Sequence, residues 1–229
     1  MRKTLLASFV AVVLWIAGSG AHAATTFNNF GPNFTYDTNL GFVVGVDGFG
    51  MNTVGALFTA EQTGFFSTLF VAANARVNTP NDGLTYSLRA DVGGRPNGLL
   101  ESIVFNDVCF DVQCPDGELL IGGASGTTLL TAGTQYWLVA TATNPDSGFF
   151  WFASLPGNAG TIFIQNLLFP DGAVFPFDQL PVFRIDVVPV GAQVPEPSQL
   201  ALVLCALLLV YLLSQRVISV IDPKVRNVG

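Results

Sequence analysis

The sequence predicts an all-β fold, a β-sandwich or jelly roll, with an N-terminal signal peptide and a C-terminal transmembrane helix. Three observations lead to this prediction. Short apolar segments recur through the middle of the chain, separated by clusters of Gly, Pro, Asn and Asp. Several segments alternate between apolar and polar residues, as a strand with one buried face does. No segment of the middle combines a sustained helical period with capping residues.

The first 23 residues have the three parts of a secretory signal peptide in order. Arg2 and Lys3 form a basic start, residues 5–17 are almost wholly apolar, and Ala21 and Ala23 place small side chains at a cleavage site. The alternative is an N-terminal membrane anchor, but a span needs about 20 apolar residues and this run is shorter. We therefore expect cleavage after Ala23.

This cleavage would remove His22, the one histidine of the sequence. Histidine is the commonest general acid–base group and metal ligand near neutral pH. The mature chain would then lack a Ser-His-Asp triad, a Cys-His dyad and any zinc site that uses histidine. The sequence assigns no catalytic residue, no metal ligand and no cofactor.

We expect residues 24–193 to form the β domain, with roughly eight to ten strands packed in two layers. In the segment 84–91, Leu84, Tyr86 and Leu88 alternate with polar residues and predict one buried face. The other expected extended segments are residues 65–77, 99–105, 134–143, 148–154, 160–166 and 181–190.

The charge of this domain argues against nucleic acid as a partner. Residues 24–194 contain four arginines, no lysine and fourteen acidic residues, a formal charge of 4 − 14 = −10. A surface of this sign repels phosphate backbones and suits a soluble exported protein.

Two cysteines, Cys109 and Cys114, lie close together in the β domain. Export would place them in an oxidising compartment, which favours a structural disulfide over free thiols. The C-x-x-C spacing of redox-active pairs is absent from this segment.

Carboxylates gather around these cysteines and suggest calcium as a candidate ligand, although their spacing does not match a known calcium loop. The favoured interpretation is therefore a solvated loop that binds no metal ion. The four residues are Asp107, Asp111, Asp116 and Glu118.

Four consecutive aromatic residues, 149–152, place two rings on each face of a strand. Exposed rings can stack on sugars, whereas burial is the usual fate of large aromatic side chains and is the favoured interpretation. A third possibility is a glycoside hydrolase with two carboxylates across a cleft, which the sequence cannot place.

Near the C-terminus, Leu200 to Leu213 is an unbroken apolar run of fourteen residues. As a helix it would span about 21 Å, against about 30 Å for a bilayer core. Pro197 suits the first helical turn, polar flanks can reach the interfaces, and Arg216 can extend to the membrane surface. We therefore predict a membrane helix, followed by a short basic cytoplasmic tail at residues 217–229.

Residues 194–216 resemble the sorting signal of the PEP-CTERM proteins of Gram-negative bacteria. The matching motif is Val194, Pro195, Glu196, Pro197 and Ser198, followed by the apolar run and Arg216. The resemblance implies processing by an exosortase-like membrane enzyme, a place at the cell surface or in the extracellular matrix, and association with exopolysaccharide or biofilm.

The segments 88–102 and 129–142 are similar to the choice-of-anchor β-sandwich domains found before such tails, a domain type with no established activity. The expected protein is therefore an exported, non-enzymatic surface or matrix protein that is first anchored in the inner membrane. The alternative is a carbohydrate-binding module that uses exposed aromatic rings, with calcium as a candidate cofactor.

Overall fold

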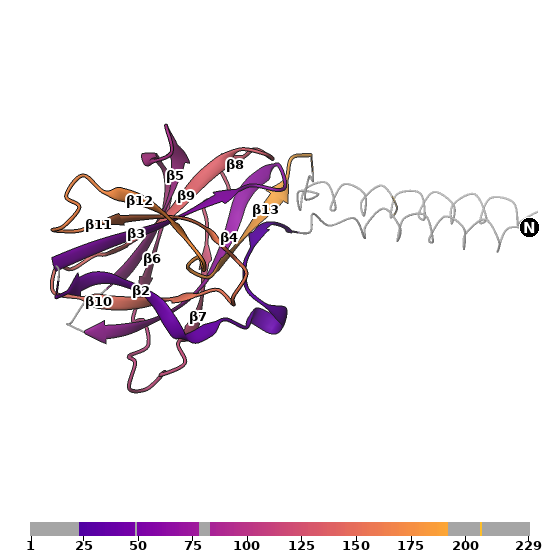
Figure 1. Ribbon diagram of the computed structural model, residues 1–229. Helices are drawn as coiled ribbons and strands as arrows, with labels where there is room; N and C mark the ends of the chain where they lie inside the picture. The colour runs from indigo at the N-terminus through magenta and orange to yellow at the C-terminus, as the bar shows by residue number, and fades with distance from the viewer. Residues whose placement is uncertain (1–22, 49, 78–82, 192–206, 208–229) are drawn as a thin grey trace, which may run out of the picture. The chain divides into compact units, whose positions relative to one another are not determined.

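The computed structural model describes residues 23–48, 50–77, 83–191 and 207, and these residues form thirteen β-strands and one short 3-10 helix, η1 (Pro32–Phe34) (Figure 1). The strands are β1 (Ala24–Asn28), β2 (Asp37–Asp47), β3 (Gly50–Thr59), β4 (Gly64–Val77), β5 (Gly83–Asp91), β6 (Pro96–Asn106), β7 (Glu118–Gly123), β8 (Leu129–Leu130), β9 (Gln135–Ala142), β10 (Gly148–Ala153), β11 (Gly160–Gln165), β12 (Ala173–Phe177) and β13 (Phe183–Pro189). The prediction of an all-β domain is confirmed, with more strands than expected.

The strands pair antiparallel in the order β1-β13-β4-β10-β2-β3-β9-β5-β6. Four further strands lie off this path, and three of them pair with it directly: β7 and β8 pair with β4, and β11 pairs with β3. The remaining strand, β12, pairs with β11.

Strand β3 connects the two halves of this sheet. Its first residues, Gly50 to Asn52, pair with β2, whereas Val54 to Thr59 pair with β9. The sheet therefore curls at β3, so that β2 and β10 lie apart from β9 and β5 (Figure 1).

The core lies between the two halves, and aromatic side chains bridge it. The ring of Trp151 on β10 meets that of Tyr86 on β5 edge to face, with centroids 4.9 Å apart. Phe183 on β13 packs against Phe58 on β3 at 5.6 Å. Side chains of both halves thus share one cluster, which is the packing that a sandwich-like curled sheet requires.

The alternation predicted for β5 is confirmed, because Leu84, Tyr86 and Leu88 are all buried in this core. Ser87 points to the opposite face and is also buried. It pairs with Val139 of β9, which belongs to a smaller cluster outside the main core.

A second apolar layer covers part of the outer face of the sheet. The segment before β2 supplies Phe30, Phe34 and Tyr36, which pack on Phe70 of β4 and Phe152 of β10. One aromatic side chain of β10 therefore faces away from the main core and is still buried.

Several predicted features lie outside the described residues. These are the signal peptide up to His22, the sorting motif and the apolar run, except for Leu207, which has a helical conformation. No helix within the described residues is both long and apolar enough to cross a membrane.

Candidate functional site

An open groove lies on the outer face of the sheet, where β10 runs between β2 and β4. Its volume is about 350 Å³. Its lining combines two aromatic rings with a cation, a carboxylate and three neutral polar side chains. The lining residues are Thr38 and Asn39 of β2, Asn74 and Arg76 of β4, Phe150 and Phe152 of β10, and Asp111 and Pro115 of the loop between β6 and β7.

The aromatic part of the groove comes from the alternation of β10. Phe149 and Trp151 point into the main core, so Phe150 and Phe152 must point outward. Phe152 is buried and Phe150 is half-buried, with their rings edge to face at 5.1 Å. Gly41 of β2 leaves room for this arrangement, because a Cβ at that position would lie 2.5 Å from the Phe150 ring.

Arg76 lies beside this aromatic surface. The central carbon of its guanidinium is 5.9 Å from the centroid of the Phe150 ring, a cation–π contact. Within the described part of the chain it has no carboxylate partner, unlike Arg184, which pairs with Asp186. The guanidinium N–H groups of Arg76 are therefore available to a ligand.

Asn74 is the most buried polar side chain of the groove, with 4% of its surface exposed. It pairs with Phe150 across the strands, which places both side chains on the same face of the sheet. Its Nδ2 donates to the backbone carbonyl of Cys114 at 3.3 Å, while its Oδ1 accepts no hydrogen bond from any described residue.

The loop between β6 and β7 forms one wall of the groove. The backbone N–H of Ala75 donates to the carbonyl of Cys109, and the carbonyl of Ala75 accepts from the N–H of Asp111, each at 2.8 Å. A disulfide joins Cys109 to Cys114, with their Cα atoms 6.0 Å apart. The loop is thus fixed to the edge of β4 and closed on itself, which places Asp111 and Pro115 at the groove.

The other acidic residues of this loop do not join Asp111 in the groove. Glu118 accepts a hydrogen bond from the backbone N–H of Cys109 at 3.0 Å. Asp107 and Asp116 are exposed. Among the described residues no group of three or more His, Cys, Asp or Glu side chains is placed to hold a metal ion.

Tyr36 connects the loop between β6 and β7 to the second apolar layer. Its hydroxyl donates to the backbone carbonyl of Asp116 at 2.8 Å. Partial burial of the ring, and to a smaller extent the negative charge of Asp116, raise the pKa of Tyr36 above the usual value of 10.0. The phenol therefore stays neutral at physiological pH and serves as a hydrogen-bond donor.

The groove does not provide the carboxylate pair of a glycoside hydrolase. Of the described residues that line it, only Asp111 carries a carboxylate. Both catalytic schemes for that reaction need a second acid about 5–9.5 Å from the first.

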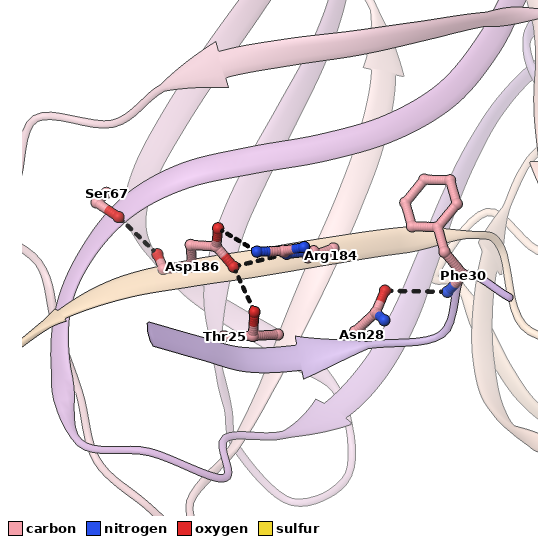
Figure 2. A network of polar contacts seen from close by, with 6 residues as sticks. All are labelled: Thr25, Asn28, Phe30, Ser67, Arg184 and Asp186. Carbon is pink, nitrogen blue, oxygen red and sulfur yellow. Dashed lines mark hydrogen bonds and ion pairs between the residues drawn. The ribbon is translucent and has the colours of Figure 1, made fainter. Parts of the chain in front are cut away.

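A second polar cluster lies on the same face of the sheet, between β1, β4 and β13 (Figure 2). The guanidinium of Arg184 makes two hydrogen bonds of 2.8 Å to the carboxylate of Asp186. The hydroxyl of Thr25 donates to the same carboxylate at 2.9 Å, and the hydroxyl of Ser67 donates to the backbone carbonyl of Asp186 at 3.0 Å. These paired groups tie β1 and β4 to β13.

The rings of the second apolar layer also pack against this ion pair. The Arg184 guanidinium lies 5.6 Å from the Phe34 ring and 5.1 Å from the Phe70 ring. The backbone N–H of Phe30 donates to Asn28 Oδ1 at 3.1 Å, which fixes the turn after β1 (Figure 2). Because these interactions are internal, we assign this cluster a structural role.

The favoured prediction for the consecutive aromatic residues, burial, is confirmed for Phe149, Trp151 and Phe152, while Phe150 remains partly accessible. Sequence reasoning missed Asn74 and Arg76. The available signal was their alternation with Ala73 and Ala75 at the end of an otherwise apolar strand.

The residues expected to act in targeting belong to a different part of the chain. Of the two cleavage-site alanines, Ala23 is described and is exposed, whereas Ala21 lies outside the described residues. The sorting motif, both ends of the apolar run and Arg216 also lie outside them. In comparisons with protein-family models and with curated proteins, the chain has no match.

Proposed function

We propose that this is an exported, non-enzymatic protein of the cell surface or extracellular matrix, delivered by its two terminal signals. The observation that carries the proposal is the order of the segments: a signal peptide ending at Ala23, a β domain, the motif from Val194 to Ser198, an apolar run and Arg216. In this proposal the β domain is a sandwich or jelly roll, and an exosortase-like enzyme processes the tail at the membrane.

Two structural features support this proposal. The last strand of the described residues, β13, ends at Pro189, and the motif at 194–198 follows it in the sequence, outside the described residues. The disulfide between Cys109 and Cys114 suits an oxidising compartment outside the cytoplasm. Both features agree with a folded exported domain that precedes a separate sorting segment.

Fractionation of a Gram-negative host that carries the processing enzyme tests this proposal. We expect the β domain at the cell surface or in the matrix, where an added protease can reach it in intact cells. In a host lacking the enzyme, the protein should accumulate in the inner membrane at its unprocessed mass. A β domain found in the cytoplasm of both hosts would contradict the proposal.

The groove favours a second candidate function, carbohydrate binding. The half-buried ring of Phe150 and the polar side chains around it form a site of mixed apolar and hydrogen-bonding character. This candidate is compatible with the first, because a matrix protein can bind the polymer that surrounds it.

A further inference from the structure

We propose that the groove between β2, β10 and the disulfide loop binds a saccharide unit, through Asn74, Arg76, Asp111 and the ring of Phe150. This inference deepens the second candidate function and rests on it. It does not depend on how the protein is sorted, because binding by the purified protein is independent of its location.

The buried acceptor of Asn74 is the first feature that points to a ligand. A buried amide oxygen without a partner costs about 1–3 kcal/mol, so native proteins satisfy nearly all such groups with protein, water or ligand. Oδ1 of Asn74 has no donor among the described residues, and the side chain lines the groove. Because Oδ1 itself is buried, a ligand hydroxyl can donate to it only when the Asn74 side chain turns toward the groove.

The placement of Arg76 is the second feature. Its contact with Phe150 restricts the guanidinium while leaving its N–H groups without a carboxylate partner among the described residues. A planar guanidinium donates well to hydroxyl and ring oxygens, and to carboxylates most strongly. The groove thus offers guanidinium donors beside the side chain of Asn74.

The combination of Asp111 with the aromatic rings is the third feature. A carboxylate accepts hydrogen bonds from neighbouring hydroxyls, and an aromatic surface packs against the apolar C–H face of a sugar. Saccharides present both features on one small rigid unit.

The size of the groove favours a short segment of a saccharide. Its volume of about 350 Å³ lies near the lower end of the range of about 300–1,000 Å³ for small-molecule sites. Because the groove is open, a longer polymer can continue beyond it. Neutral sugars and uronic acids share the required hydroxyl chemistry, and they differ in whether a carboxylate reaches Arg76.

The test is a titration of the oxidised full-length protein, purified in a detergent without a sugar headgroup. The probes are a neutral galactose tetrasaccharide and a galacturonic acid tetrasaccharide, and binding is followed by calorimetry. We expect at least one probe to bind. Tighter binding of the galacturonate probe would identify the carboxylate as a ligand of Arg76, and equal binding would identify the hydroxyls as sufficient.

Three variants test the site itself. Arg76→Gln and Asp111→Asn each remove one charge at the groove and should weaken binding about tenfold, as expected for loss of a charge-assisted hydrogen bond. Asn74→Leu keeps a similar volume but removes both the acceptor and the hydrogen bond from Nδ2 to the carbonyl of Cys114, and it should weaken binding at least as much. If Asn74→Leu fails to fold, the other two variants decide the question.

Matched controls make the same charge changes away from the groove. Arg95→Gln alters an arginine that donates to the backbone carbonyls of Asp171 and Gly172, and Asp107→Asn alters an exposed residue before the disulfide loop. Both controls should bind as the wild type does. Absence of binding to both probes, or equal weakening in variants and controls, would overturn the proposal.

Discussion

At the scale of single residues, the buried hydroxyl of Tyr86 in the main core lowers the stability of the folded protein. The side chain is 1% exposed and packs against the rings of Trp151 and Phe105, while its hydroxyl has no hydrogen-bond partner among the described residues. Desolvation by this burial raises the pKa of Tyr86 well above 10.0. The ring therefore stabilises the folded protein, whereas the hydroxyl destabilises it because it loses its hydrogen bonds to water.

We predict that Tyr86→Phe stabilises the protein by about 1 kcal/mol, because it removes an unpaired buried hydroxyl and keeps the ring. Tyr136→Phe is the matched control, since the Tyr136 hydroxyl accepts a hydrogen bond from the N–H of Thr131 at 3.0 Å. The free energy of unfolding of the control should fall by about 1 kcal/mol, because its hydrogen bond is lost. Urea denaturation measures both changes, and destabilisation by Tyr86→Phe would contradict this account.

The same tyrosine predicts how stability changes in alkaline solution. The unfolded chain releases the phenol proton near pH 10, while the folded protein retains it to higher pH, so the unfolded state binds fewer protons in this range. Stability should therefore fall as the pH rises above about 10, by up to about 1.4 kcal/mol per pH unit for this group. In Tyr86→Phe the fall should be less steep by that amount, as urea denaturation from pH 9 to 11 would show.

At the scale of elements, glycines determine where neighbouring strands can approach. Gly45 of β2 pairs with Gly148 of β10 and with Asn52 of β3, at the point where the two halves of the sheet meet. Its φ is +85°, and a Cβ there would collide with the carbonyl oxygen of Ser147. That carbonyl accepts the N–H of Val46 at 2.8 Å and cannot move without losing this hydrogen bond.

We predict that Gly45→Ala destabilises the domain by about 3 kcal/mol, from the combined cost of a positive φ and a collision with the backbone. Gly93→Ala separates these two terms, because Gly93 has a φ of +63° with no atom within 4 Å of an added Cβ. The free energy of unfolding of Gly93→Ala should fall by only about 1 kcal/mol, because only the positive φ opposes the added Cβ. Equal losses in thermal denaturation would show that the collision at Gly45 is relieved.

The strands differ in how far the sequence could predict them. The segments that became β4, β5, β9, β10 and β13 were predicted because they are apolar or alternate clearly. Strands β2 and β3 were missed because glycines interrupt them, and glycine is a weak strand former. Their glycines are required by close packing, which depends on partners distant in sequence.

The groove was less predictable than the strands for a related reason. Its residues come from three strands and one loop, and their proximity depends on pairing register. The pairing of Asn74 with Phe150 joins positions that are far apart in the chain, and no local pattern specifies it. The sequence indicated two outward-facing rings on β10 but could not identify the polar side chains beside them.

At the scale of the whole molecule, the roles proposed for delivery and for binding belong to different parts of the chain. The β domain provides a stable sheet with a polar and aromatic groove, and the two terminal segments provide the proposed signals for export and sorting. In the motif, the proposed sorting depends on Pro195, Glu196 and Pro197. A plain stiff linker, by contrast, would need no specific residue.

The most direct test of the proposed sorting is the fate of the tail in the double variant Pro195→Ala/Glu196→Ala. One epitope is placed after Gly191 and another after Gly229, and both are followed by immunoblotting of membrane and surface fractions. The matched control, Asp222→Ala/Pro223→Ala, makes the same kind of change beyond the apolar run. We predict that wild type and control lose the C-terminal epitope and reach the surface, while the double variant keeps both epitopes in the inner membrane. Identical processing and location of all three proteins would contradict the account.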